Sequence, residues 1–126
     1  MIDILVIGTG ISGLTYAIKI AEKNPRINLT LISKNDINEG NTLYAQGGIA
    51  VVNNFKKDSI EKHIDDTIVA GDGLCNKDVV RFVIEEGIIR LNELINWGVE
   101  FDKKKDQFDL LIEGGHSEKR IFHNKD

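Results

Sequence analysis

A glycine fingerprint directly after an apolar run constrains this chain more than any other feature. Gly8, Gly10 and Gly13 follow the continuously apolar run Ile4–Ile7, which is typical of a strand buried on both faces of a parallel sheet. Apolar residues then recur at helical spacing: Leu14, Ala17, Ile18 and Ala21. In such a fingerprint the first glycine permits a tight turn, the second lets backbone approach a pyrophosphate, and the third lets the helix pack closely on the strand. The helix N-terminus attracts the anion, so the pattern predicts dinucleotide binding rather than a structural glycine-rich turn.

A second strand is expected at residues 27–32, after Asn24 and Pro25 end the helix, which completes a βαβ unit. Dinucleotide-binding folds commonly place an acidic residue at the end of this strand to bind a ribose. Here Ser33 and Lys34 occupy that point. A hydroxyl and an ammonium could hydrogen-bond the ribose or neutralise a phosphate, although Lys34 could also be an exposed lysine at a strand end. Asp36 and Glu39 are the alternative acids.

The rest of the chain predicts a long loop, two helices and a small hairpin. Residues 33–54 are rich in Gly, Asn and Ser without a sustained period, which favours a functional loop. A capping box of Asp58 and Glu61 predicts a helix that ends at Gly71, and a second helix is expected from Asn76 to Gly98. Residues 99–102 and 107–111 flank a charged turn at 103–106 and predict the hairpin. The fold class is therefore α/β, an incomplete doubly wound Rossmann-like domain that lacks the later strands.

The composition excludes several classes of protein. The 126 residues hold 41% hydrophobic residues and a net charge of −4, as expected of one globular domain without a nucleic-acid partner. The single cysteine, Cys75, excludes an intramolecular disulfide and a multi-cysteine metal site. No apolar run is long enough for a membrane span or has the features of a signal peptide, so the sequence predicts a cytoplasmic protein without membrane contact.

A second motif lies inside the long loop and carries a family resemblance. The stretch Asn41–Gly48 combines an aromatic ring, an amide and a glycine pair. Together with the glycine fingerprint it resembles the FAD-binding segment of the succinate dehydrogenase, fumarate reductase and L-aspartate oxidase flavoproteins. The resemblance, together with the fingerprint, implies the following FAD-binding residues: Gly8, Thr9, Gly10, Ile11, Ser12, Gly13, Ser33, Lys34, Asn41, Thr42, Leu43, Tyr44, Ala45, Gln46, Gly47 and Gly48.

One position in this loop bears on how the flavin is attached. Members similar to succinate dehydrogenase carry a histidine, covalently bonded to the flavin, where this chain has Asn41. An asparagine cannot form that bond. The resemblance therefore implies a non-covalently bound FAD, and it makes succinate dehydrogenase the second choice.

A third motif runs from Glu113 through Gly114 and Gly115 to His116 and Ser117, with Arg120 three residues on. A glycine pair allows a substrate or flavin to approach the backbone. The Glu113 carboxylate can bind an ammonium group, His116 and Ser117 can hydrogen-bond a carboxylate, and Arg120 offers a planar fork. A metal site is not expected, because His116 and His123 lie seven residues apart with no cysteine or third histidine nearby.

This segment resembles the L-aspartate oxidase branch of the family, which has the same Glu-Gly-Gly-His-Ser string. A carboxylate at Glu113 complements the amino group that distinguishes aspartate from succinate. Many members have a basic residue where this chain has Ile112, so the contacts of that basic side chain are not expected here. The resemblance implies FAD-dependent oxidation of L-aspartate to iminoaspartate, with oxygen or fumarate as acceptor. The product would pass to quinolinate synthase in de novo NAD biosynthesis.

The resemblance covers residues 1–126 and only the N-terminal part of the family's chain. Its capping domain and C-terminal helical domain would lie beyond Asp126, so we expect these 126 residues alone to be inactive. Two alternatives stay open. One is a fumarate reductase or succinate dehydrogenase flavoprotein subunit, and the other is a non-catalytic nucleotide-binding module.

Overall fold

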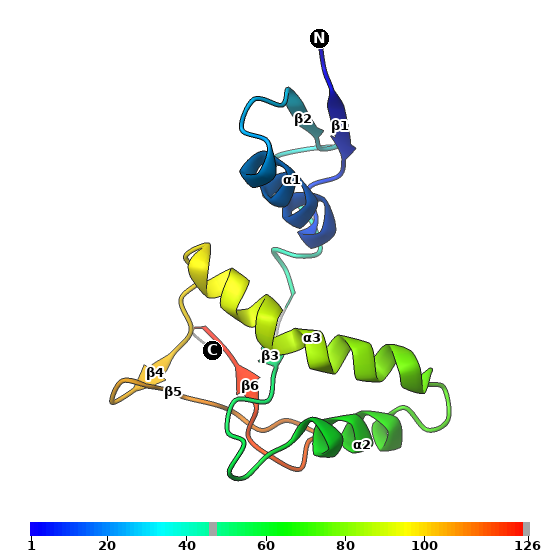
Figure 1. Cartoon of the computed structure of the whole chain (residues 1–126), viewed down its shortest axis with the longest axis vertical. Helices are drawn as coiled ribbons and strands as arrows, with labels where there is room; N and C mark the ends of the chain where they lie inside the picture. Colours follow the sequence, from blue (N-terminus) through cyan, green and yellow to red (C-terminus); the bar gives the residue numbers. More distant parts are fainter. Residues whose placement is uncertain (46–47, 125–126) are drawn as a thin grey trace. The chain divides into compact units, whose positions relative to one another are not determined.

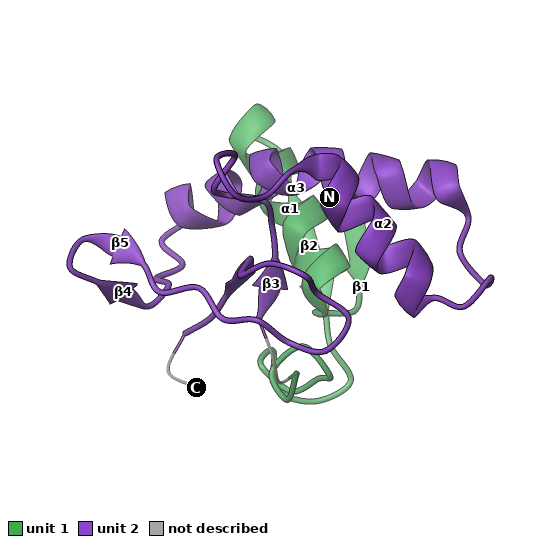
Figure 2. Cartoon of the chain, turned by 90° about the horizontal axis from the view of Figure 1, so that it is seen from below, with its two compact units in different colours: residues 1–46 green, residues 47–126 purple. Residues whose placement is uncertain are grey.

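The computed structural model describes residues 1–45 and 48–124. The chain forms two compact units, residues 1–46 and residues 47–126 (Figure 2). Each unit has its own helices and strands. The glycine fingerprint belongs to the first unit, and the Glu113–Arg120 segment belongs to the second.

The first unit is the predicted βαβ motif. Strand β1 (Ile4–Ile7), helix α1 (Ile11–Lys23) and strand β2 (Leu29–Ile32) follow one another, and the two strands pair in parallel. The register places Ile4 beside Leu29 and Ile7 beside Ile32. Helix α1 lies against both strands (Figure 1). Thus the sequence pattern located this unit correctly, with β2 two residues shorter than expected.

The prediction that the first strand is buried on both faces is wrong for this chain. Val6 is buried, whereas the side chains of Leu5 and Ile7 are 49% and 78% exposed. Successive side chains of a strand point to opposite faces, and α1 covers the face that holds Val6. The apolar run identified the strand, but the other face of this two-stranded sheet is open to solvent.

The second unit joins two helices to short strand pairs. Its elements are β3 (Ile49–Ala50), α2 (Ile60–Ala70), α3 (Lys77–Asn96), β4 (Lys103–Lys104), β5 (Gln107–Phe108) and β6 (Ile121–Phe122). Helices α2 and α3 pack side by side, and β3 pairs with β6 in antiparallel register (Figure 1). A two-residue strand therefore interrupts the long loop predicted at residues 33–54.

The helix ends follow capping chemistry, with one correction. Ser59 is the N-cap of α2, and its side chain accepts a hydrogen bond from the Lys62 amide at 3.1 Å. The predicted cap, Asp58, lies one residue before the N-cap, and its carboxylate accepts hydrogen bonds from Arg120 instead. Helix α3 begins directly after Asn76, near the predicted start, and the Asn76 side chain caps it; Gly98, at φ +94°, takes the left-handed conformation expected after that helix.

An apolar core lies between α3 and the strands of the second unit. Its buried members are Val51, Leu91 and Phe122. Phe101 and Phe108 meet the ring of Phe122 edge-on, with centroids 5.6 and 5.0 Å away. Edge-to-face pairs of this kind stabilise a core beyond the area that they bury. The core thereby fixes β6, the strand directly after Arg120.

The hairpin exists, but its turn is tighter than predicted. Lys103 pairs with Phe108 and Lys104 with Gln107, so the two lysines belong to the strand β4. The loop consists of Lys105 and Asp106, both with positive φ (52° and 63°). Two-residue loops with two positive φ angles match the twist of the strands. The predicted strand at residues 99–102 is therefore wrong, because β4 lies within the lysine run that the prediction assigned to the turn.

Within residues 1–45 and 48–124, no helix is long and apolar enough to cross a membrane.

Candidate functional site

The fingerprint glycines form a tight turn between β1 and α1. Gly8 has φ +103°, a conformation that residues with a Cβ rarely adopt. A Cβ on Gly13 would overlap the carbonyl oxygen of Gly8 and lie 3.4 Å from Val6 Cγ1. Helix and strand therefore approach as closely as a pyrophosphate-binding turn requires. This geometry fits the diphosphate of a dinucleotide such as FAD.

A residue of the long loop caps the first turn of α1. Gly10 is the N-cap residue and has no side chain to cap the helix. Instead, Thr42 Oγ1 accepts a hydrogen bond from the Ile11 amide at 3.1 Å. Two of the predicted cofactor-binding segments, the fingerprint and the loop, thus meet at the helix N-terminus. Ser12 is exposed in the same turn.

Predicted residues also meet at the end of β2. Thr9 Oγ1 donates to Ser33 Oγ at 3.2 Å, and Ser33 Oγ donates to the Asp36 carbonyl at 3.2 Å. Lys34 is exposed. The Asp36 carboxylate accepts a hydrogen bond from the Asn38 amide at 3.0 Å. The hydroxyls of Thr9 and Ser33 therefore lie where a ribose would be expected. The Asp36 carboxylate instead accepts a hydrogen bond within its own turn.

The loop residues are largely exposed. Tyr44 donates its hydroxyl to Glu39 at 2.9 Å, which gives that alternative acid a partner. Three further loop residues in the first unit are exposed: Asn41, Leu43 and Ala45. Gln46 and Gly47 lie outside the described residues. Gly48 has a packing reason to be glycine, because a Cβ there would overlap the Phe122 carbonyl oxygen and Ile121 Cγ2.

In the second unit, Glu113 and His116 form the ends of a turn around the glycine pair. The His116 amide donates to the Glu113 carbonyl at 3.2 Å, and Gly115 has φ +84°, as the third residue of a type II turn requires. The Glu113 side chain is exposed and that of His116 is half-buried. The turn thus brings a carboxylate and an imidazole, both predicted substrate ligands, onto one short segment.

Arg120 has different partners from the predicted one. Its guanidinium is fully buried, and Nε and Nη2 donate to the two carboxylate oxygens of Asp58 at 2.8 and 2.7 Å. Nη1 donates to Asp66 at 2.6 Å. We expected this fork to face a substrate carboxylate, but in this structure it faces two carboxylates, Asp58 just before α2 and Asp66 within it. Burial of a guanidinium is costly unless it is paired, so these bonds fix the end of the segment.

Ser117 is also committed to α2. Its amide and its hydroxyl both donate to Asp66 at 2.8 Å. Partial burial alone would raise the pKa of Asp66, but the bonds from Ser117 and Arg120 outweigh it and lower that pKa to about 2. The predicted role of Ser117 as a donor to substrate is not what this geometry favours, since its hydrogen points to Asp66.

His116 and His63 complete a cluster with the residues just described: Asp58, Asp66, Ser117 and Arg120. His116 Nδ1 lies 3.2 Å from Arg120 Nη1, and the rings of the two histidines are 5.5 Å apart. His63, on α2, is buried, and its Nδ1 has no hydrogen-bond partner among the described residues. Burial, and then the charge of Arg120, lower the pKa of His63 to about 4. His63 is therefore neutral near pH 7.

Three residues of this cluster, on α2 or just before it, were not predicted to belong to the site. Asp58 was assigned to a helix cap, and His63 and Asp66 were not considered. The available signal was the three-residue spacing of His63 and Asp66, which places both on one face of an amphipathic helix. Buried polar side chains on α2 need hydrogen-bond partners, but the spacing of these residues does not identify Arg120 as the partner.

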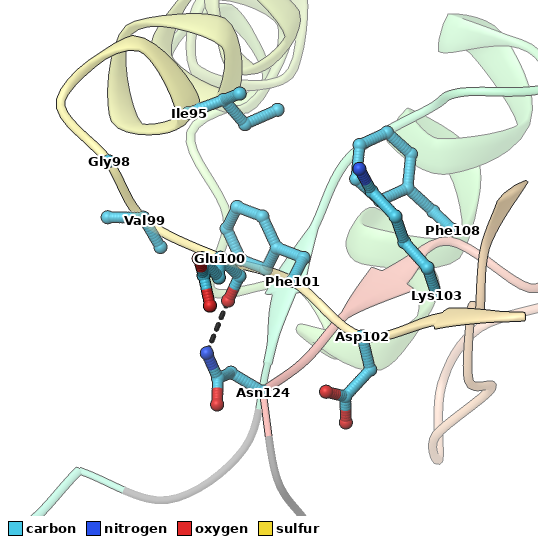
Figure 3. Close-up of a pocket in the computed structure, with 9 residues that line it drawn as sticks. All are labelled: Ile95, Gly98, Val99, Glu100, Phe101, Asp102, Lys103, Phe108 and Asn124. Atoms are coloured by element: carbon cyan, nitrogen blue, oxygen red, sulfur yellow. Dashed lines mark hydrogen bonds between the residues drawn. The ribbon is translucent and has the colours of Figure 1, made fainter. Parts of the chain in front are cut away.

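Two of the hollows in the second unit, both apart from Glu113, lie along α3. One, of about 500 Å³, is lined by the end of α3 and the hairpin, where Asn124 Nδ2 donates to the Glu100 carbonyl (Figure 3). The other, of about 310 Å³, is mostly apolar and lies beside His63, between α2 and α3. His123 is buried, with Nδ1 3.3 Å from Asp102 Oδ2. No group of three or more potential metal ligands gathers in the part of the chain that the structure describes.

Comparison with known proteins gives concordant matches. A protein-family model described as FAD binding domain matches residues 3–126. An L-aspartate oxidase from Yersinia pestis is 43% identical over 98% of this chain, and a chloroplastic L-aspartate oxidase from Nicotiana tabacum is 46% identical over 98%. Among solved structures, E. coli quinol fumarate reductase FrdA is similar with a TM-score of 0.85 and 33% identity over 96% of this chain.

These relatives are much longer than the chain. It spans 24% of the Yersinia pestis protein, 19% of the tobacco protein and 21% of the fumarate reductase chain.

Proposed function

The chain belongs to the FAD-binding domain family, and on that premise we propose that it is the N-terminal part of an L-aspartate oxidase. Membership in this flavoprotein family, the α/β fold class and FAD as the cofactor are confirmed predictions. The proposed reaction is the oxidation of L-aspartate to iminoaspartate. When bound, FAD supplies the acceptor for the hydride that leaves the α-carbon.

The first unit offers the residues that would hold FAD. Gly8 and Gly13 shape the tight turn so that the backbone at Gly10 can approach the diphosphate, and the N-terminus of α1 attracts its negative charge. The Thr9 and Ser33 hydroxyls can exchange their mutual hydrogen bond for bonds to a ribose. Lys34, exposed at the end of β2, supplies a positive charge. We propose that the loop from Asn41 to Gly48 contacts the flavin.

The observation that carries the choice of substrate is the Glu113–His116 turn. It presents an exposed carboxylate one glycine pair away from an imidazole, while Ser117 and Arg120 anchor the segment on α2. A carboxylate attracts the ammonium of an amino acid and repels a second carboxylate. Of the substrates named by the relatives, aspartate alone has an ammonium group, so Glu113 favours aspartate over succinate or fumarate.

Two finer parts of the proposal come from the resemblance. The electron acceptor would be oxygen or fumarate, and the product would be consumed by quinolinate synthase on the route to NAD. We propose that this takes place in the cytoplasm, without a nucleic-acid partner.

Replacement of Glu113 tests the choice of substrate. In the full-length flavoprotein, Glu113→Gln removes the charge from a hydrogen bond worth roughly 1.5–3 kcal/mol, so kcat/KM for aspartate should fall about ten- to a hundredfold. Fumarate reduction should fall much less. Glu118→Gln, in the same segment but paired with Lys62, is the matched control. Equal losses for aspartate and fumarate at unchanged flavin content would remove Glu113 as the reader of the amino group.

Denaturation tests the proposed non-covalent attachment of FAD. Asn41 lacks the imidazole that forms the histidyl–flavin bond in similar proteins, so acid or heat precipitation should release all FAD into the supernatant. Flavin fluorescence that stays with the denatured band after electrophoresis would contradict this proposal.

The second candidate is a fumarate reductase or succinate dehydrogenase flavoprotein subunit. The TM-score of 0.85 with the E. coli fumarate reductase chain favours this candidate. The same similarity favours the whole flavoprotein family to an equal degree. A hydrogen peroxide assay with aspartate separates the two. Peroxide production with aspartate supports the first proposal, whereas fumarate reduction without any aspartate oxidation supports the second.

A further inference from the structure

The bonds between the Glu113–Arg120 segment and α2 leave few side-chain donors for a substrate carboxylate. The Ser117 hydroxyl donates its hydrogen bond to Asp66. Arg120 uses Nε, Nη1 and Nη2 on Asp58 and Asp66, and Nη1 has one further hydrogen, directed at His116. The predicted carboxylate ligands are His116, Ser117 and Arg120. Of these, His116 alone has a polar atom, its second ring nitrogen, outside this network.

The contact between Arg120 and His116 fixes where the imidazole carries its proton. A guanidinium has five N–H donors and no acceptor, so at 3.2 Å Arg120 Nη1 must donate to His116 Nδ1. An imidazole nitrogen that accepts is unprotonated, and the neutral ring then carries its hydrogen on Nε2. That nitrogen lies on the far side of the ring from Arg120.

We propose that Arg120, clamped by Asp58 and Asp66, is a positioning residue that holds His116 in the Nε2–H form as a hydrogen-bond donor to a substrate carboxylate. This inference rests on the proposed function, because it assumes a dicarboxylic substrate. Arg120 then contributes to recognition without touching the substrate.

The surroundings make the clamp rigid. The guanidinium is fully buried, and the Asp58 side chain is 3% exposed, so neither can turn to water as an alternative partner. Separation of such a pair would leave a buried charge without compensation. His63, whose ring faces His116 at 5.5 Å, adds no positive charge near neutral pH because its pKa is about 4. Arg120 is therefore the cation that orients His116.

Two substitutions of His116 separate the two ring nitrogens. Glutamine places an amide donor near the position of Nε2, whereas asparagine places one near Nδ1. In the full-length holoprotein, the Kd for succinate can be measured from the change in flavin absorbance without any turnover. We expect His116→Gln to retain affinity within about threefold and His116→Asn to lose about tenfold or more. Lys119→Gln, an exposed neighbour, is the control.

The tautomer itself is measured by nitrogen NMR of ¹⁵N-histidine-labelled protein, with the His116 signals assigned by their loss in His116→Gln. We expect an unprotonated Nδ1 and a protonated Nε2 in the wild type. Arg120→Lys keeps a cation but cannot span Asp58, Asp66 and His116, so a mixture of tautomers and weaker succinate binding should follow. If Arg120→Lys does not fold, the wild-type tautomer and the two His116 variants decide.

A protonated Nδ1 in the wild type, or equal losses in His116→Gln and His116→Asn, would overturn the inference. Because succinate has no ammonium group, these outcomes do not depend on whether Glu113 reads aspartate. Failure of the wild type to oxidise aspartate would instead count against the proposed function and leave the succinate and NMR results to judge Arg120.

Discussion

The two units build their parts of the candidate site in opposite ways. In the first unit, backbone geometry makes the site, through the positive φ of Gly8 and the close approach at Gly13. In the second unit, side-chain charges hold the segment that carries Glu113, through bonds from Arg120 to Asp58 and Asp66. The first site is therefore vulnerable to added atoms, and the second to removed charges.

The largest expected effect is the loss of the buried cation. Arg120→Met leaves the Asp58 carboxylate buried without a counter-charge, and removal of one partner of a buried pair typically costs about 3–5 kcal/mol of unfolding free energy. Chemical denaturation of the full-length protein measures it. Arg90→Met, which removes an exposed arginine paired with Glu86 and Glu93 on α3, should change stability little. Similar effects in the two variants would erase the contrast between buried and surface pairs.

A pH titration sharpens the same comparison. The folded-state pKa of His63, about 4, lies below its ordinary value of 6.5. Between these values the unfolded chain binds a proton that the folded chain does not, so stability is complete above pH 6.5 and falls as the pH drops toward 4. The loss should be on the order of 3 kcal/mol, and His63→Gln should flatten this part of the stability curve. A wild-type curve that is already flat between pH 6.5 and 4 would show that His63 takes up its proton in the folded state.

An added methyl group tests the first unit. Gly13→Ala forces a Cβ into the Gly8 carbonyl, and overpacking of this kind costs about 1–3 kcal/mol and should displace FAD from the holoprotein. Gly40→Ala, where a Cβ would meet nothing within 4 Å, is the control. Flavin content per protein measures the effect, and full occupancy in Gly13→Ala would show that the turn can widen.

The smallest effect is expected at the glycine pair of the second unit. Gly115 has φ +84°, so Gly115→Ala should cost about 1–2 kcal/mol, whereas Gly114→Ala meets open space. The turn places Glu113 and His116, so Gly115→Ala should raise KM for aspartate while the flavin content stays unchanged. If the flavin content falls with KM, the glycine pair serves the cofactor as well as the substrate.

The sequence predicted those features whose signals are local. The strand Ile4–Ile7, the glycine turn and the start of a helix near Asn76 follow from the types of neighbouring residues, and the structure confirms them. The hairpin turn was misplaced because a run of lysines does not distinguish a strand from its loop.

The partners of Arg120 were beyond local reasoning. Asp58 precedes it by 62 residues and Asp66 by 54, and no periodicity connects residues at such separations. The cap expected from Asp58 illustrates the ambiguity, since the same carboxylate could serve a helix end nearby or a distant cation. Residue types alone left both options open, and burial selected the second.

The separation between Arg120 and Asp58 also has a consequence for the order of folding. Helices α2 and α3 are neighbours in sequence and can associate early, because contacts over short separations lose little chain entropy. The clamp closes a loop of 62 residues, which is entropically more demanding and gains its energy only once α2 is in place to present both carboxylates. We therefore expect the segment with Glu113 and His116 to be among the last parts of the second unit to become ordered during folding.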